Sequence, residues 1–105
     1  MIQRNKVLGT LGLAMKSGNV ASGEQMTEQA VRSGKAKLVI VAEDASDNTK
    51  KKFLNSCRYY HVPIAVFEEK EKLGSAIGKQ FRASLAVLDQ GFASSISKNL
   101  DLEEM

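Results

Sequence analysis

The chain has 105 residues, of which 43% are hydrophobic and 26% are charged, and its formal net charge is only +3. This length and this balance are typical of one small globular domain and exclude a disordered chain. The single cysteine, Cys57, and the single histidine, His61, exclude an intramolecular disulfide and a metal site built from several such residues.

The charges are unevenly distributed along the chain. Three of the acids, Asp101, Glu103 and Glu104, lie in the last seven residues, which leaves the first 98 residues with 15 bases, 9 acids and a net charge of +6. We therefore expect one domain over residues 1–98 and an acidic tail over 99–105. A modestly basic domain favours an anionic partner.

The N-terminal residues and the lengths of the apolar runs indicate where in the cell the protein is expected. Residues 1–5 are polar and lack the apolar stretch of a signal peptide. No apolar run approaches the roughly 20 residues that a membrane-spanning helix needs. We expect a cytoplasmic protein with no membrane association.

The first half of the chain predicts helix, strand, helix and strand, over residues 3–16, 20–22, 24–33 and 38–42. Met26, Ala30 and Val31 fall on one side of the second helix and are expected to be buried. Gly34 is the expected residue just beyond its end. The last run, Leu38-Val39-Ile40-Val41-Ala42, is apolar throughout, which is typical of a strand covered on both faces.

The second half predicts helix, strand, helix, strand and helix, over residues 50–60, 64–67, 71–77, 84–88 and around Phe92, Ile96 and Leu100. Ser46 or Asp47 is a candidate N-cap for the first of these helices. Its inward side is expected to hold Phe53, Leu54, Cys57 and Tyr60. Such alternation of helices and strands predicts an α/β domain, with a central sheet between layers of helices.

Few residues favour an enzyme. Cys57 lies on the apolar side of its predicted helix, where it acts as a small hydrophobic residue. His61 lies at a helix end, where a positive charge suits the helix dipole. The adjacent Glu43 and Asp44 are best explained as a solvated capping loop, and no glycine-rich phosphate loop is present. We expect no catalysis, no cofactor and no small-molecule substrate.

The positive charges are more informative. Several lysines lie near predicted element ends, but a run such as Lys50-Lys51-Lys52 spreads across different faces of a helix. The segment Gly78–Arg82 is more specific, because it combines Phe81 with two bases in a polar loop. An exposed aromatic ring beside bases suits stacking on unpaired nucleotides. The alternative is that Phe81 packs into the core.

Three blocks together resemble one family. The blocks at residues 30–44, 62–64 and 70–78, with their spacing, resemble the ribosomal protein L7Ae family, which also includes L30e. This resemblance covers about residues 4–98. Ser22-Gly23-Glu24 and the segment 89–93 are similar to the bacterial YlxQ-type branch of that family.

The resemblance implies a three-layer α/β/α sandwich with a small mixed central sheet. It also implies a partner, namely structured RNA containing a kink-turn, a sharply bent helix with a bulge flanked by tandem G·A pairs. Ribosomal RNA is one source of such a motif. A monomer is expected.

The family motif that reads the RNA has a glycine, an asparagine two residues later, then a glutamate, and a lysine six residues after the glycine. It corresponds to Gly23–Gln29, where only the glycine is retained. Gln25 replaces the asparagine, Met26 the glutamate and Gln29 the lysine. The resemblance assigns RNA contacts to this helix start, including Glu24, with Gln25 and Gln29 keeping hydrogen-bonding capacity.

Further RNA contacts are implied outside this motif. Lys79, Gln80, Phe81 and Arg82 correspond to the loop that packs against the flipped-out bulge nucleotide, and Ser46, Lys50, Lys70 and Lys37 correspond to other positions on the RNA side. The predicted function is recognition of a kink-turn and stabilisation of its bend. The alternative, favoured by the altered motif, is a ribosome-associated or protein-interaction module of the same fold with weakened or altered RNA specificity.

Overall fold

Helices and strands alternate along the computed structural model, which describes residues 2–102. The elements are α1 (Arg4–Lys16), β1 (Val20–Ser22), α2 (Glu24–Arg32), β2 (Leu38–Val41), α3 (Asp47–Tyr60), β3 (Ile64–Val66), α4 (Lys70–Ala76), β4 (Ser84–Val87) and α5 (Gln90–Asn99). Every element predicted from the sequence is present, and the order is the predicted one. Within residues 2–102, no helix is both long and apolar enough to cross a membrane.

The strands form one mixed sheet in the order β1-β4-β2-β3. β2 and β3 run parallel, with Val39 opposite Ile64, while β4 runs antiparallel to both β1 and β2. All residues of the central strands β2 and β4 are buried. This confirms that the apolar run at 38–42 forms a strand covered on both faces.

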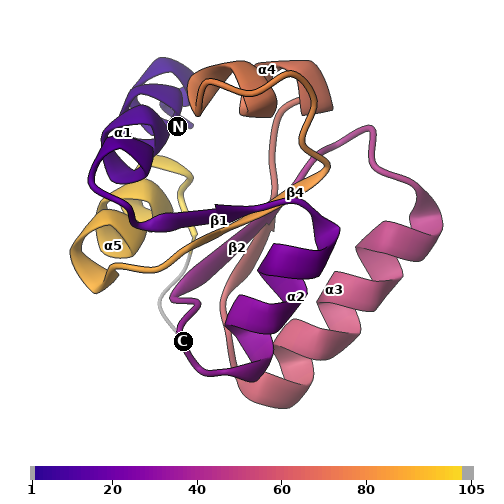
Figure 1. Cartoon of the computed structure of the whole chain (residues 1–105). Helices are drawn as coiled ribbons and strands as arrows, with labels where there is room; N and C mark the ends of the chain where they lie inside the picture. The colour runs from indigo at the N-terminus through magenta and orange to yellow at the C-terminus, as the bar shows by residue number, and fades with distance from the viewer. Residues whose placement is uncertain (1, 103–105) are drawn as a thin grey trace.

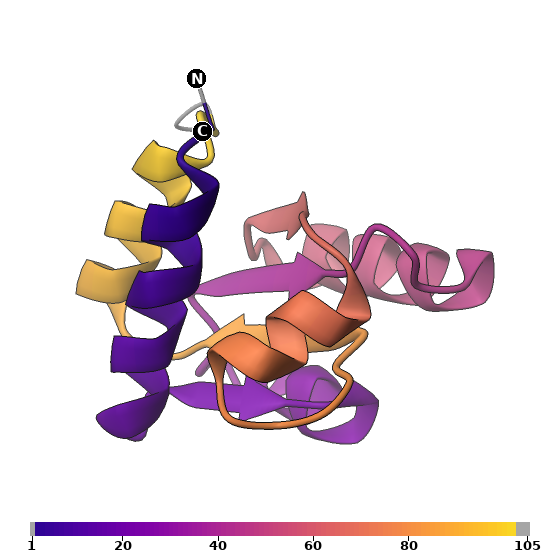
Figure 2. The same cartoon turned by 90° about the horizontal axis from the view of Figure 1, so that it is seen from above.

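Two layers of helices enclose the sheet. Figure 1 shows α2 and α3 on one face, and α1, α4 and α5 on the other. Seen from above, α1 lies side by side with α5, and α4 lies on the other side of α1 and contacts it (Figure 2). The predicted three-layer α/β/α sandwich with a small mixed sheet is confirmed.

Three side chains that were expected to be buried are exposed. Met26 is 54% exposed, Leu54 45% and Tyr60 40%. The buried residues of α2 are Thr27, Ala30 and Val31, and those of α3 are Phe53 and Cys57. Met26 and Leu54 each lie one residue from a buried neighbour, which turns them about 100° around the helix axis and away from the core.

Helix ends follow local capping chemistry. Ser46 is the N-cap of α3 and accepts a hydrogen bond from the Thr49 N–H, so this helix begins three residues earlier than predicted. Gly34 follows α2 with a φ of +78°, as expected for a residue just beyond a helix. Leu100 is buried, so the core continues past the predicted domain end at residue 98. Of the predicted tail, residues 103–105 lie outside the described residues.

The strand directions define two ends of the sheet. At one end, Ser22, Val41 and Val66 finish their strands where Ser84 begins β4, and we call this the Ser84 end. At the other, Val20, Leu38 and Ile64 begin their strands where β4 finishes, and we call this the Val87 end. The helices α2, α3 and α4 each follow a strand that finishes at the Ser84 end. Their N-termini therefore gather there.

Candidate nucleic-acid interface

Most of the predicted RNA-contacting residues gather around the Ser84 end of the sheet. They come from four segments: the start of α2, the start of α3, the start of α4 and the loop that leads into β4. Because these segments follow or precede strands of one sheet, the sheet fixes their relative positions. Chain segments far apart in the sequence thus form one surface.

The start of α2 presents free backbone donors. Gly23 has a φ of +91°, which favours glycine, and its N–H donates to the Ser84 carbonyl at 3.0 Å. No side chain caps this helix. The N–H groups of Glu24, Gln25 and Met26 in its first turn therefore have no partner within the helix. Together with the helix dipole, they suit a phosphate or a base edge.

Gln25 and Gln29 extend this surface along α2. Both are exposed, and their spacing of four residues stacks them on one side of the helix. Met26 lies beside them and is also exposed. The exposed side of the first two turns therefore carries two amides and a thioether in the positions of the family motif.

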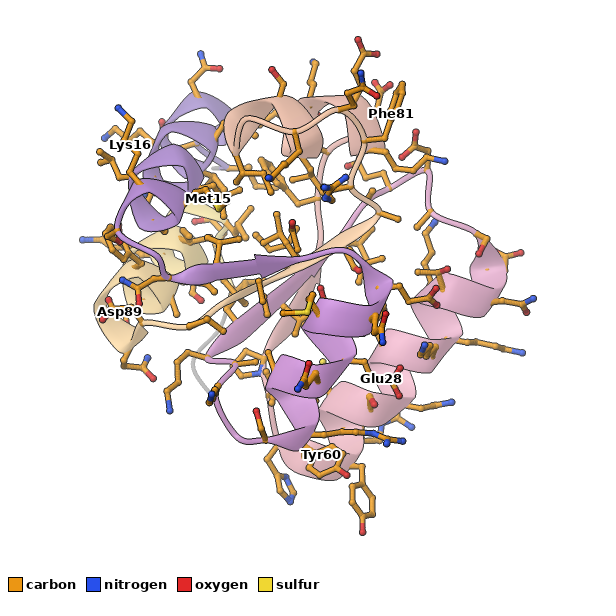
Figure 3. The ribbon with its side chains drawn as sticks, in the orientation of Figure 1. Met15, Lys16, Glu28, Tyr60, Phe81 and Asp89 are labelled. Carbon is orange, nitrogen blue, oxygen red and sulfur yellow. The ribbon has the colours of Figure 1, made fainter. Side chains whose placement is uncertain are left out.

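The loop 77–83 carries the exposed aromatic ring. Phe81 is 60% exposed and points away from the sheet (Figure 3), so it does not pack into the core. The loop is fixed to α4 at both of its ends, where the Lys79 N–H donates to the Gly74 carbonyl at 2.8 Å and the Arg82 N–H to the Lys70 carbonyl at 3.1 Å. Lys79 and Gln80 are both exposed, and Gln80 and Phe81 lie between the two anchored residues.

Arg82 is held in place by two oxygens. Its Nε donates to the Ser22 hydroxyl at 3.1 Å, and an outer guanidinium nitrogen donates to the Phe81 carbonyl at 2.7 Å. These bonds orient the guanidinium beside the start of α2. Sequence reasoning did not identify Ser22 as part of the site, because no local pattern pairs two residues 60 positions apart.

A buried hydroxyl pair fixes α2 to the sheet. Thr27 and Ser84 are both fully buried, and the Ser84 hydroxyl donates to that of Thr27 at 3.4 Å. The pair joins the first turns of α2 to the first residue of β4. It therefore holds the α2 start against the strand that follows the Phe81 loop.

Carboxylates on α2 are partly neutralised by α3. The Lys52 ammonium lies 2.6 Å from Glu28 and 3.3 Å from Glu24, and Arg32 lies 3.5 Å from Glu28. Glu28 occupies the space between the two helices (Figure 3). The hydrogen bond from Lys52 lowers the pKa of Glu28, and the same bond raises the pKa of Lys52. Lys52, within the lysine run, is thus used in an ion pair.

The starts of α3 and α4 complete the surface. The Ser46 hydroxyl is already engaged as the N-cap of α3, and Lys50 is half-buried one turn further on. The Asp44 carboxylate accepts a hydrogen bond from the Lys70 N–H at 2.9 Å. This confirms the capping role expected for the acidic loop, although Asp44 caps α4 rather than the helix that follows it.

Lys37 does not join these residues. Its N–H donates to the Val87 carbonyl at 2.7 Å, which places it at the Val87 end of the sheet. Lys37 precedes β2. The other predicted residues follow the ends of β1, β2 and β3 or precede the start of β4, so they lie at the Ser84 end. Lys37 therefore lies at the opposite end of the sheet from the Phe81 loop, and its RNA contact stays a prediction.

No metal centre is present in the part of the chain that the structure describes, since it holds no group of three acidic, histidine or cysteine ligands. Cys57 is buried, as predicted, and burial raises the pKa of its thiol to about 11. A thiol in this state is a poor nucleophile and a poor ligand.

Comparisons with known proteins identify the family of this chain. The model of the ribosomal protein L7Ae/L30e/S12e/Gadd45 family matches residues 5–97. The chain is 46% identical to the RNA-binding protein YlxQ of Bacillus subtilis over 87% of this chain and 91% of that protein. It is 29% identical to the large ribosomal subunit protein eL8 of Thermoplasma volcanium over 90% of this chain and 79% of that protein.

Solved structures share the same architecture. A protein from Bacillus halodurans superposes with a TM-score of 0.89 at 38% identity, covering 91% of this chain and 97% of that one. A Giardia lamblia 15.5 kDa RNA-binding protein superposes with a TM-score of 0.79 at 21% identity, covering 92% of this chain and 86% of that one, and shows the shared fold. The chain therefore belongs to the ribosomal protein L7Ae/L30e/S12e/Gadd45 family.

Proposed function

We propose that the protein binds a kink-turn in structured RNA and stabilises its bend without catalysis. Two kinds of relative support this, those named as RNA-binding proteins and a ribosomal protein. The proposed contact residues lie at the Ser84 end and on α2, and they do not include Lys37. They are Gly23, Glu24, Gln25, Gln29, Ser46, Lys50, Lys70, Lys79, Gln80, Phe81 and Arg82.

The observation that carries the proposal is the pairing of an uncapped helix start with an exposed ring and a fixed guanidinium. The α2 start offers N–H donors, Phe81 offers a stacking face, and Arg82 lies between them with its Nε on Ser22. A kinked RNA presents all three matching groups in one place: phosphates, base edges in an opened groove and an extruded base. Single-stranded or regular helical RNA presents only some of them.

Each part of the surface has a separate task. Lys50, Lys70, Lys79 and Arg82 contact phosphates and set the register of the protein on the RNA. The first two turns of α2 hydrogen-bond the edges of the G·A pairs, and the Phe81 loop holds the bulged nucleotide. Because free RNA samples the bend, binding shifts a population that already exists.

Calorimetric titration tests the proposal. The ligands are a standard kink-turn and the same RNA with its G·A pairs replaced by Watson–Crick pairs. We expect tight binding to the first only, and an affinity that falls with salt at a log–log slope of about −2 to −4, as for three to five phosphate contacts. Equal binding to both RNAs contradicts kink-turn recognition.

A second candidate function, a ribosome-associated or protein-interaction module with altered RNA specificity, is favoured by the charges on α2. Glu24 and Glu28 are two carboxylates on α2, the helix proposed to contact the base pairs. They form ion pairs with Lys52 and Arg32. The cation that the family motif supplies is replaced by Gln29. Weak binding to both RNAs in the titration, with retained binding to ribosomal particles, supports this candidate over the first.

A further inference from the structure

A large groove lies at the other end of the molecule, between α3, β3 and α5. Its volume is about 1480 Å³, and it is lined by residues of the α3 C-terminal half, the β3 start, α5 and the chain that follows α5. Typical small-molecule pockets enclose roughly 300–1,000 Å³. The size and the open form suit a stretch of polypeptide better than a small ligand.

The floor of the groove is aliphatic. Leu54 is 45% exposed, and Pro63, Ile64 and Leu102 are half-buried around it. Among the described residues that line the groove there is no phenylalanine, tyrosine or tryptophan. Aliphatic side chains bind apolar side chains of a partner, whereas unpaired bases need aromatic or guanidinium faces on which to stack.

The rim of the groove is basic. Of the residues that the structure describes, Lys37, Arg58, His61 and Lys98 line it and are all exposed, and Asp101 is the one acid in that part of the lining. Lys37, Arg58 and Lys98 are the cations of this rim, and they come from the segment before β2, the end of α3 and the end of α5, on different sides of the aliphatic floor. An occupant with complementary charge carries carboxylates on both sides of apolar groups.

The backbone of β3 adds hydrogen-bonding groups to one wall. β3 is an edge strand, and Val39, its neighbour in β2, lies opposite Ile64 and donates its N–H to the Pro63 carbonyl. In a parallel ladder this register turns the N–H and C=O of Ile64 away from β2, toward the open side of the sheet. Such groups are available to a peptide in extended form.

We propose that this groove binds a short acidic segment of a protein partner, in extended form beside β3. Its carboxylates lie against Arg58 and Lys98, its apolar side chains lie on Leu54 and Ile64, and its backbone pairs with Ile64. This surface is separate from the Ser84 end, so the segment and RNA bind at the same time. The proposal also explains why an apolar side chain, that of Leu54, is exposed at this position.

Fluorescence anisotropy with a labelled synthetic peptide tests the proposal. The probe is a peptide of about ten residues in which leucines alternate with glutamates, matched to the period of two of an extended strand. The variant carrying Arg58→Glu and Lys98→Glu is expected to bind it at least about tenfold more weakly than the unaltered protein. Leu54→Ser is expected to weaken binding comparably. All three positions are exposed, so we expect the fold to be retained, which circular dichroism checks.

Matched controls separate a specific site from general charge attraction. The variant carrying Lys51→Glu and Lys72→Glu changes the net charge equally outside the groove, and we expect less than about a twofold effect on peptide binding. A peptide with lysines in place of the glutamates is expected not to bind. Hydrogen exchange at the Ile64 amide is expected to slow in the complex.

Three results overturn the proposal. The first is equal binding of the acidic and basic peptides, and the second is an unchanged exchange rate at Ile64 with the acidic peptide bound. The third is a loss of RNA affinity in the Arg58 and Lys98 variant, without binding of the acidic peptide to the unaltered protein. In that case the groove is a second RNA surface. The kink-turn proposal stands or falls separately, because its residues lie at the Ser84 end.

Discussion

Arg82 and Ser22 join two segments that are 60 residues apart, through a hydrogen bond of 3.1 Å from the guanidinium Nε to the serine hydroxyl. Ser22 ends β1 immediately before the Gly23 turn, and Arg82 leads into β4 immediately after Phe81. The bond therefore connects the two sides of the proposed RNA surface. It fixes the direction of the guanidinium before any ligand arrives.

Ser22→Ala is expected to lower affinity for the kink-turn without changing its salt dependence. The substitution removes one hydrogen bond, worth about 0.5–1.5 kcal/mol, and leaves every cation in place. Arg82→Ala is expected to cost more and to reduce the magnitude of the log–log salt slope by about 1, as for one lost phosphate contact. Titrations over a series of salt concentrations distinguish the two. An unchanged slope in Arg82→Ala argues against a phosphate contact.

Phe81→Ala is expected to weaken RNA binding by about 1–3 kcal/mol, the range for loss of one base stacked on an aromatic ring. Because Phe81 is 60% exposed, the melting temperature is expected to stay within a few degrees of that of the unaltered protein. Tyr59→Ala is the matched control, since Tyr59 is 75% exposed at the far end of α3. Equal losses in the two variants are incompatible with a stacking role for Phe81.

Much of this fold follows from the spacing of apolar residues. The run at 38–42 is apolar on both faces and lies in the middle of the sheet, where each face is covered by helices. Spacing alone does not decide between adjacent apolar residues on a helix. Leu54 follows Phe53 and Met26 precedes Thr27, and in each of these pairs only one residue faces the core.

The site is harder to predict than the fold because its contacts cross the sheet. The Gly23 turn and the exposed loop with Phe81 follow from local composition. The bond between Ser22 and Arg82 depends on β1 pairing with β4 in a particular register, which no local pattern encodes. The position of Lys37 is also not encoded locally, because the direction of β2 in the sheet decides at which end a residue next to that strand lies.

Gln29→Lys is expected to raise affinity for the kink-turn severalfold and to steepen its salt dependence. The substitution restores the cation of the family motif on an exposed position of α2, one turn from Gln25. Ser95→Lys adds the same charge on an exposed position of α5 and is expected to change affinity little. If both variants gain equally, the effect comes from net charge and position 29 does not contact the RNA.

The Cys57 thiol is expected to resist alkylation at pH 8 in the native protein and to react at once after unfolding in denaturant. Burial raises its pKa from the usual value near 9 to about 11, so almost no thiolate is present. In the unfolded chain the thiol ionises at lower pH than in the folded one. The contribution of Cys57 to stability is therefore complete below about pH 8.5 and is lost as the pH rises toward about 11.

The Cys57→Ala variant provides the control for that pH dependence, since it has no thiol to ionise. We expect the free energy of unfolding of the unaltered protein to fall more steeply between about pH 9 and 11 than that of the variant. The measurement is urea unfolding at a series of pH values. Parallel curves contradict a buried, protonated thiol, as does rapid alkylation of the native protein at pH 8.

Gly74 supports the Phe81 loop by having no side chain. It is buried in α4, and a Cβ at this position would collide with the Gln80 carbonyl group and crowd the Phe81 N–H. Gly74→Ala gains up to about 1 kcal/mol of helix propensity, but overpacking against a backbone carbonyl costs about 1–3 kcal/mol. We therefore expect lower thermal stability together with weaker RNA binding, because the displaced loop carries Phe81 away from Arg82 and the α2 start.

Gly9→Ala separates the effect on the loop from the general effect of alanine in a helix. Gly9 lies in α1, and a Cβ there meets no atom within 4 Å. This variant gains the helix propensity without the collision, so it is expected to be slightly more stable than the unaltered protein and to bind RNA equally well. Thermal melting and RNA titration of both variants test whether RNA affinity depends on the position of the Phe81 loop. If Gly74→Ala lowers stability but leaves RNA affinity unchanged, RNA binding does not depend on the position of the Phe81 loop.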